Sequence, residues 1–472
     1  MPTLKVPFAT QSYRSRSKPL SAQRLMNLYP ESAPQDAKSP VVLYGTPGLA
    51  SFATVGTGPI RGQKPMAGVL YVVSGNALYR VTSTGAATSL GTVPGSGPVY
   101  MVENGYQLGV LNDLYDLYVY NKDTAAFAQV TDPDFGEAAT VDYIDGYGVF
   151  TRPDSEEFFL SDLRDLTAYD ALDFAAAESS TDGLVRVFVN RSEVWLFGNQ
   201  TTEVWVNTGA ADFPLERVAG AILQCGIIGA RAVTSVDGVV YWIGDDRVIY
   251  RGAGYQEERV STPAIDALLD GFATVSDAEM FSYTQEGHPF VVCNFPSESV
   301  TIVFDPTTGM WHERGTWNPA TGDFSRWIVG TYAACYGKHL VGHYSTGALY
   351  ELDLDTYTED GAEIVRQAVS PPISMDNVRM TFSALQIDLE AGVGLNTGQG
   401  SDPQVRLDWS DDGARTWSNP RSVTFGPRGA YRQRAMFRRL GQARERVFRL
   451  WISDPVKVAV IGAVLDFEKG TS

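Results

Sequence analysis

The chain has 472 residues, 44% of them apolar, which is enough core material for two to four domains or one large repeat fold. Its 55 Asp and Glu residues outnumber its 37 Lys and Arg residues. The net charge of −18 argues against a protein that wraps nucleic acid through its average surface, although it leaves room for a local basic patch. Three scattered cysteines argue against a disulfide framework, and no apolar run approaches the roughly 18 residues of a membrane span. The 46 Gly, 25 Pro and 11% aromatic residues favour a mostly β protein. We expect it to fold in a reducing cytoplasm, without a secretory leader or stable membrane insertion.

The first segment, residues 1–64, is rich in Ser, Pro and Arg. Its short strand-like stretch Val41–Tyr44 is followed by the turn sequence Thr46-Pro47-Gly48. The segment does not fit the repeat that follows it, and we expect an N-terminal arm with a few strands.

Residues 65–362 repeat a strand–turn–strand pattern, as in residues 68–81, where two apolar strands flank a Ser-Gly-Asn turn. One aromatic residue marks the second strand of each copy, at intervals of 39 to 54 residues: Tyr79, Tyr118, Phe159, Trp205, Tyr250, Phe304 and Tyr350. Such a period is typical of β-propeller blades, which bury their faces against each other with aromatic residues in the wedge between sheets. We predict an all-β fold with a central β-propeller of about six to seven blades. An array of β-sandwiches is the alternative, because the spacing is irregular.

Helical signal is sparse, and Thr262–Asp270, with a proline near its start, is the best candidate for a helix. From Pro371-Pro372 onward, alternating segments such as Val405–Trp409 and Val456–Leu465 predict a separate β domain over residues 363–472. Neither this segment nor residues 1–64 obviously encloses a core alone. We therefore expect the two to form one β-rich platform, with the propeller inserted between them.

The stretch from Ser410 to Trp417 nearly matches the Asp-box, a hairpin sequence Ser-x-Asp-x-Gly-x-Thr-Trp. In such a hairpin the Ser and Asp side chains satisfy backbone groups of the turn, and the Trp packs beneath it. We interpret Ser410, Asp412 and Trp417 as a structural turn. The alternative is a sugar-acting protein, because Asp-boxes recur in sialidases and related propellers.

The sequence offers no clear constellation for chemistry. His339 and His343 are four residues apart, but glycines and tyrosines around them predict a strand hairpin and not a metal-binding helix face. Neither a nucleophile elbow nor a phosphate-binding loop occurs. We expect no catalytic, cofactor-binding or metal-binding residues, and no cofactor.

The most unusual feature is a run of arginines near the C-terminus. Ten arginines and a single Glu445 lie between Gly413 and Leu450, which gives this segment about +9 and leaves −27 for the rest of the chain. Arginine suits bidentate pairing with carboxylates or phosphates at partly buried interfaces. A solvated basic face, a nucleic-acid contact and a protein interface are the three possible interpretations, and we favour the interface. Its expected residues are Arg428, Arg432, Arg434, Arg438, Arg439, Arg444 and Arg446.

The N-terminal strings add a resemblance. Residues 12–17 (SYRSRS), 21–24 (SAQR) and 27–31 (NLYPE) precede 43–49 (LYGTPGL). This opening resembles that of the tail nozzle, or hub, proteins of short-tailed bacteriophages, also called packaged-DNA stabilisation proteins. The layout of the whole chain is also similar to that family.

The resemblance implies a structural virion protein and not an enzyme, made in the host bacterial cytoplasm. It implies a ring of identical subunits, six in number, that extends the DNA exit channel and retains packaged DNA. The partners so implied are the portal adaptor, a tail needle or plug, and tailspikes or fibres. Packaged double-stranded DNA would pass through an acidic lumen without tight binding, because like charges repel.

Two other classes remain open at this point. A carbohydrate-binding or glycosidase propeller, sialidase-like in design, is motivated by the Asp-box-like hairpin and by five tryptophans of the repeat region: Trp195, Trp205, Trp242, Trp311 and Trp317. Glycosidic chemistry needs two carboxylates facing each other across a cleft, which a sequence cannot show. A propeller that scaffolds host proteins is the third class.

Overall fold

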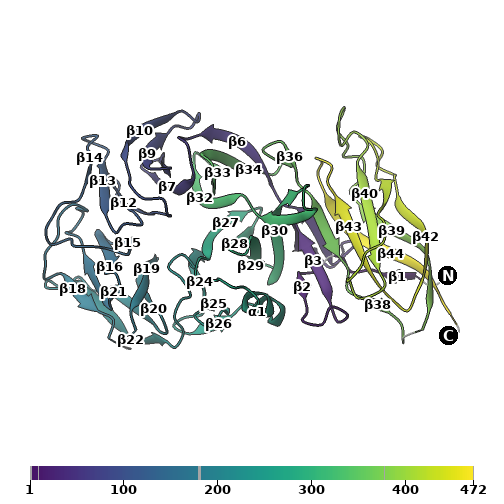
Figure 1. The fold of residues 1–472 in the computed structure, drawn as a ribbon, viewed down its shortest axis with the longest axis horizontal. Coiled ribbons are helices and arrows are strands. Elements are labelled where there is room, and N and C mark those ends of the chain that lie inside the picture. Colours follow the sequence, from purple (N-terminus) through teal and green to yellow (C-terminus); the bar gives the residue numbers. More distant parts are fainter. Residues whose placement is uncertain (1–2, 9, 179–181, 377, 471–472) are drawn as a thin grey trace.

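The computed structural model of this chain describes residues 3–8, 10–178, 182–376 and 378–470. It is built almost wholly from strands, and a propeller and a β-sandwich lie side by side along the long axis of the molecule (Figure 1). The helix α1 (Pro263–Asp270) is the one α-helix among the described residues, and it lies where the sequence predicts a helix. Thr262 caps its first turn. No helix in the described ranges is long and apolar enough to cross a membrane.

The propeller has seven blades, each built on four antiparallel strands. Blades one to five are separate four-stranded sheets, blade six continues from β30 through β3 into a sheet of the sandwich, and blade seven belongs to a six-stranded sheet. Blades one and two are β7 (Ile60–Met66), β8 (Val69–Ser74), β9 (Ala77–Val81), β10 (Ala87–Thr92), then β11 (Tyr100–Glu103), β12 (Gln107–Leu111), β13 (Leu117–Asn121), β14 (Phe127–Gln129). Blades three and four are β15 (Thr140–Ile144), β16 (Tyr147–Thr151), β17 (Glu157–Leu160), β18 (Phe174–Ala176), then β19 (Leu184–Asn190), β20 (Glu193–Gly198), β21 (Thr202–Asn207), β22 (Leu215–Leu223). Blades five and six are β23 (Val233–Val236), β24 (Val239–Ile243), β25 (Ile249–Gly252), β26 (Glu257–Arg259), then β27 (Glu279–Gln285), β28 (His288–Phe295), β29 (Val300–Asp305), β30 (Met310–Asn318). A short β31 (Asp323–Arg326) pairs with β30.

The seventh blade is completed by a strand from the N-terminal side of the propeller. Its first three strands are β32 (Val329–Cys335), β33 (Lys338–His343) and β34 (Ala348–Asp353). The outer strand is β6 (Gly48–Thr54), which pairs antiparallel with β34, and the short β35 (Thr358–Glu359) and β36 (Ala362–Glu363) extend the same sheet. Because β6 continues directly into blade one, this pairing joins the last blade to the first.

Each of the seven marker aromatics lies on the third strand of its blade, and each packs between that blade and the one before it. Phe159, for example, belongs to the apolar cluster between blades two and three, and Tyr350 belongs to the cluster between blades six and seven. Tyr79 packs at the seam between blades seven and one. The predicted propeller and the role of its aromatic residues are confirmed.

The β-sandwich is assembled from both ends of the chain around one apolar core. Its first sheet is β4 (Leu28–Ser32), β5 (Val41–Gly45), β44 (Ala459–Lys469), β39 (Met380–Leu389) and β42 (Ala435–Ala443), with β1 (Thr3–Lys5) on β44. Its second sheet contains β2 (Tyr13–Arg14), β3 (Ala22–Met26), β37 (Arg366–Val369), β43 (Glu445–Ile452), β40 (Gln404–Ser410) and β41 (Arg421–Thr424), with β38 (Ile373–Ser374) on β43. The two termini lie near one another at this end (Figure 1).

One expected boundary differs in the structure. Residues 1–64 were expected to lie outside the propeller, but β6 belongs to blade seven and β7 begins blade one at Ile60. The N-terminal contribution to the sandwich therefore ends near Gly45. The physical reason is that the ring of blades must be closed, and a short alternating strand does not reveal in its sequence which sheet it will join.

The joint between the two modules is polar and buried. Asn27 donates from Nδ2 to the carbonyl oxygens of Gly315 in blade six (2.8 Å) and Val365 (2.9 Å). The buried carboxylate of Glu313 pairs with Arg24 at 2.9 Å and with Arg14 at 3.3 Å. The strings that carry the family resemblance therefore lie where the propeller meets the sandwich.

Candidate interaction surface on the sandwich

The arginine-rich segment covers β41, the loop before β42, β42 and β43. Of these strands, β42 lies at the end of the sandwich away from the propeller (Figure 1). Strand β42 is the last strand of its sheet, so its outer side has no strand partner in the described part of the chain. A charged edge strand of this kind resists pairing with unrelated strands and offers a defined surface to a partner.

Six arginines of the expected set are exposed and define what we call the arginine edge: Arg428, Arg432, Arg434, Arg438, Arg439 and Arg444. Among the residues that the structure describes, no carboxylate forms an ion pair with the first five of them. Arg428 donates to Oδ1 of Asn396 at 2.9 Å, and the side chain of Tyr431, in the same loop, is 78% exposed. These five arginines therefore form a concentration of positive charge whose neutralisation is left to another molecule or to salt.

A bulge shapes this edge. The register of β42 against β39 shifts between Gly441 and Arg438, and Arg439 adopts a positive φ of 58°. The guanidinium of Arg421, on the edge strand of the facing sheet, donates to the carbonyl oxygens of Arg438 (2.9 Å) and Arg439 (3.1 Å). Bulges are common where a side chain must be re-aimed, and this one turns two successive arginines outward.

Arg446 does not belong to the surface, although the sequence placed it there. Its side chain is 2% exposed and forms a two-pronged ion pair with Asp411. It also donates to the carbonyl oxygen of Leu440 and lies against the ring of Phe382. The Asp411 carboxylate is close to Arg446 in space but 35 residues away in sequence. A count of charges within the arginine-rich segment leaves Asp411 out and therefore does not reveal that Arg446 is paired.

Arg449 is likewise engaged inside the molecule. Its guanidinium pairs with Asp408 and lies 3.8 Å from the centre of the Trp417 ring. Such a planar group stacked on an aromatic face contributes to packing as well as to charge pairing. Arginines of this segment thus divide into an inner set that holds the sandwich together and the exposed arginine edge.

The Asp-box-like stretch forms a hydrogen-bonded turn. Oδ1 of Asp412 accepts from the backbone N–H groups of Arg415 and Thr416, both at 2.9 Å, and Oγ of Ser410 accepts from the N–H of Ala414 at 2.9 Å. Hydrogen bonds from the side chains of Ser410 and Thr416 lower the pKa of Asp412. Trp417 packs on Arg449. The Ser410 and Asp412 side chains are thus used by the turn itself.

The histidine pair His339 and His343 lies on strand β33, as the hairpin interpretation predicts. Nδ1 of His339 meets the hydroxyl of Tyr332 at 2.9 Å, and Nδ1 of His343 accepts from the backbone of Ser345. Burial lowers the pKa of both imidazoles. Within the described ranges, no three His, Cys, Asp or Glu residues gather in a way that could hold a metal ion.

The negative charge is concentrated at the opposite end of the molecule. The stretch of residues 100–182, which includes blades two and three, contains 18 Asp and Glu residues and 3 Lys and Arg residues, a net charge of −15. Blades two and three lie at the far end of the long axis from β42 (Figure 1). The acidic stretch can be seen in the sequence. The total charge of −27 for all residues outside the arginine-rich segment does not show where the acidic residues are concentrated.

A second basic region lies at the joint and was not predicted. A cleft of about 450 Å³ is lined by the β2–β3 hairpin, by α1 and by the sandwich. Four N-terminal cations contribute to its wall: Arg14, Arg16, Lys18 and Arg24. Glu313 forms ion pairs with Arg14 and Arg24. Lys18 and Arg16 face solvent, and Arg16 is only 3.8 Å from Asp270 in an exposed ion pair. The arginines of the opening strings therefore serve mainly to close the joint.

Two chains of solved structures that match this chain have low sequence identity to it. A chain of the computationally designed Ika8 protein is 12% identical, with a TM-score of 0.38, and the match covers 70% of this chain and 99% of that chain. A chain of the mitotic checkpoint complex is 12% identical, with a TM-score of 0.41, over 62% of this chain and 89% of that chain. No curated protein matches this chain.

Family models match nearly the whole length. The model described as bacteriophage P22 Gp10, beta-propeller, matches residues 4–357, and the model described as bacteriophage P22 Gp10, beta-sandwich, matches residues 365–468. The propeller joined to a sandwich is thus the architecture of a structural protein of a phage tail, a component of the virion. The chain belongs to the bacteriophage P22 Gp10 family of tail nozzle, packaged-DNA stabilisation proteins. The resemblance of the N-terminal strings is confirmed.

Proposed function

We propose that this protein assembles with identical copies, six in number, into a ring that extends the DNA exit channel of a short tail and retains the packaged DNA. In this proposal the ring docks the portal adaptor, a needle or plug, and tailspikes or fibres. The protein acts by shape and charge and not by catalysis. Membership of the tail nozzle family supports the role, and the arrangement of charge supports the assembly.

The observation that carries the assembly is the separation of charge along the molecule. The arginine edge lies at one end of the long axis, and blades two and three lie at the other, within a stretch (residues 100–182) that has a net charge of −15. Two different patches that complement each other favour head-to-tail contacts, which close into a ring when the rotation between subunits permits. We assign the arginine edge to a protein interface in the tail, with a neighbouring subunit or with the adaptor.

The same distribution suits a conduit for DNA. A duplex binds tightly where cations displace its counterions, and it slides more freely past an acidic wall. The propeller contributes most of the negative charge of the chain, and the arginine edge is confined to the sandwich. DNA is therefore proposed as cargo that passes through and not as a tightly held ligand.

The test replaces four exposed arginines of the edge with alanine: Arg432, Arg434, Arg438 and Arg439. A matched control replaces four exposed propeller arginines with alanine: Arg80, Arg164, Arg191 and Arg217. Both variants and the wild type are mixed with the purified adaptor, and particles are sized by light scattering and viewed by negative-stain microscopy. We expect the edge variant to lose ring formation or adaptor binding while the control retains both.

The outcomes separate the possible roles. Loss of rings without loss of adaptor binding assigns the edge to the subunit contact, and the reverse assigns it to the adaptor. If both contacts survive while virions carrying the edge variant lose their DNA, the edge contacts DNA and the protein-interface assignment is wrong. Release of sugar from bacterial surface polysaccharide by the purified chain would overturn the structural role itself.

A further inference from the structure

A small cavity lies at one end of the propeller, where the innermost strands begin. Successive blades are each built on four antiparallel strands, so every innermost strand runs in the same direction and starts at the same face. Residues that start blades one, five, six and seven line the cavity, among them Arg61, Arg231, Glu279 and Thr331. Arg326, which ends β31, completes the wall. The sequence separates these arginines widely, and only the closed ring of blades brings them together.

Arg326 is buried without a matching anion. The residue is 7% exposed, and its guanidinium carbon lies 3.8 Å from the centre of the Tyr344 ring. Its Nε has no hydrogen-bond partner in the described part of the chain, and no carboxylate there forms an ion pair with the guanidinium. Burial lowers the pKa of Arg326, although Glu279, Tyr344 and Asp277 act to raise it. Burial of a guanidinium group without an ion-pair partner destabilises the folded protein unless another hydrogen-bond acceptor binds to it.

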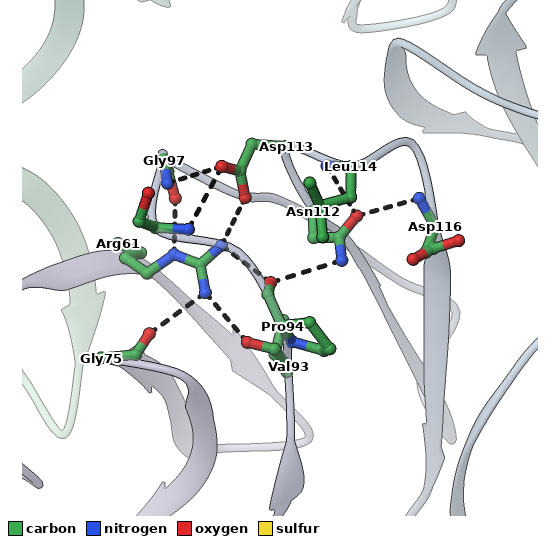
Figure 2. Close-up of polar contacts among 10 residues, drawn as sticks. Arg61, Gly75, Val93, Pro94, Gly97, Asn112, Asp113, Leu114 and Asp116 are labelled. Carbon is green, nitrogen blue, oxygen red and sulfur yellow. Dashed lines mark hydrogen bonds and ion pairs between the residues drawn. The ribbon is translucent and has the colours of Figure 1, made fainter.

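The other two arginines of the cavity are already satisfied or paired. Arg61 has five N–H donors, and all five are used by carbonyl oxygens and by Asp113, as Figure 2 shows. Its ion pair with Asp113, at 2.8 Å, balances its charge. Nε of Arg231 lies 3.4 Å from a carboxylate oxygen of Glu279. Arg326 is thus the one arginine lining this cavity that forms no ion pair among the described residues.

Thr331 supplies a second donor in the same wall. It is 9% exposed, and its Oγ1 has no hydrogen-bond partner among the described residues. The cavity measures about 90 Å³. A single water needs roughly 10–15 Å³, so the space holds a small group of several heavy atoms. A nucleotide or a sugar ring is too large to enter it whole.

We propose that this cavity binds a single oxyanion group, a carboxylate or a phosphate, through the guanidinium of Arg326 and the hydroxyl of Thr331. The planar guanidinium matches two oxygens of such a group, and charge-assisted hydrogen bonds of this kind are the strong ones. The group can belong to a free ion or to an acidic side chain of a docking protein. The site needs only one propeller and does not depend on the ring.

The test is calorimetric titration of the purified full-length chain with inorganic phosphate and, separately, with acetate, at constant ionic strength. We expect one site per chain for at least one of the two anions. Arg326→Gln should weaken binding at least about tenfold, because a hydrogen bond to a charged group is lost. Thr331→Val, which keeps the shape of the side chain, should weaken it by a smaller factor. Arg80→Gln, an exposed arginine of blade one, is the control and should bind as the wild type does.

The two anions distinguish the source of the group. Stronger binding of acetate supports a carboxylate, such as that of an acidic peptide, and stronger binding of phosphate supports a phosphate ligand. Absence of saturable binding of either anion overturns the proposal, as does unchanged binding by both variants. Circular dichroism checks that Arg326→Gln is folded; should it not fold, the comparison of Thr331→Val with the wild type decides.

Discussion

Arg446 and Asp411 form a two-pronged ion pair in the sandwich, with an Nε–Oδ1 distance of 2.6 Å and an Nη2–Oδ2 distance of 2.8 Å. The guanidinium side is 2% exposed, whereas 43% of the Asp411 side chain is exposed. Asp411 lies in the turn that follows β40, and Arg446 lies on β43, so the pair fastens the turn to the sheet. Arg446 is therefore part of the interior, although it belongs to the arginine-rich segment.

Arg446→Ala should lower the free energy of unfolding by about 3 kcal/mol, the low end of the range for breaking a buried ion pair, because Asp411 can reach water once it is unpaired. The variant also loses the contact of the guanidinium with the Phe382 ring. Denaturant titration followed by circular dichroism measures the change.

The control for this prediction is Arg432→Ala, from the exposed part of the same segment. A surface substitution away from special contacts is expected to change stability by less than about 0.5 kcal/mol. Equal losses in the two variants would contradict the division into inner arginines and an arginine edge.

The repeat made the propeller readable from the sequence. One aromatic residue in each blade fills the wedge against the preceding blade, and a position with the same physical task in every blade leaves a periodic mark. Tyr79 and Tyr350 therefore pointed to the two ends of the blade series before any pairing was known. The helix α1 was readable for a similar reason, since Pro263 at its start acts locally.

Contacts between distant segments could not be read in this way. Nothing local in residues 48–54 says that they pair with β34, which follows almost 300 residues later. The partner of Arg446 is hidden for the same reason, since Asp411 is one of many acidic residues in the chain. Arg61, Arg231 and Arg326 line the same cavity only because the whole propeller closes into a ring. Long-range pairing, and not local pattern, decides these sites.

The turn that leads from β6 into blade one should be sensitive to a single added methyl group. Gly58, in the turn after β6, has a φ of 77°, and a Cβ there would lie 2.1 Å from the backbone carbon of Thr346. Gly58→Ala should therefore cost about 1–2 kcal/mol for the left-handed backbone and about 1–3 kcal/mol more for the steric conflict. Chemical denaturation measures the loss.

Gly68→Ala isolates the steric part of that loss. Gly68 has nearly the same φ, 76°, but a Cβ there would have no atom within 4 Å. Its substitution should cost only the backbone part, about 1–2 kcal/mol. If Gly58→Ala lowered the free energy of unfolding no more than Gly68→Ala does, the tight contact between Gly58 and Thr346 would not matter for stability.

His312 should make the protein less stable in mild acid. Burial, together with Arg314 and His288, lowers its pKa to about 3. An ordinary histidine has a pKa of about 6.5, so the unfolded chain takes up a proton in this pH range that the folded chain does not. Stability therefore falls as the pH drops below about 6.5, by at most about 1.4 kcal/mol per pH unit for this group.

The variant His312→Phe removes that proton uptake and keeps an aromatic ring beside Phe290, whose ring centre lies 5.6 Å from that of His312. When the pH is lowered from 7 to 5, the free energy of unfolding of the variant relative to that of the wild type should rise by about 2 kcal/mol. Denaturant titrations at the two pH values give the difference, in which the other histidines cancel. Parallel losses in the two proteins would show that His312 already takes up its proton in the folded state.

Salt should weaken the contact made by the arginine edge. Exposed charges act over a Debye length, which shrinks from about 30 Å at 0.01 M to about 8 Å at physiological ionic strength. The association rate of the wild type with its tail partner, measured by stopped-flow fluorescence, should fall at least about tenfold over that range, because charge steers the encounter. The edge variant with Arg432, Arg434, Arg438 and Arg439 replaced should associate slowly at all ionic strengths and show a much weaker dependence on salt.

The control variant with four propeller arginines replaced should keep the steep dependence of the wild type. A steep dependence that persisted in the edge variant would assign the steering to another surface, of which the basic hairpin carrying Arg16 and Lys18 is the next to test.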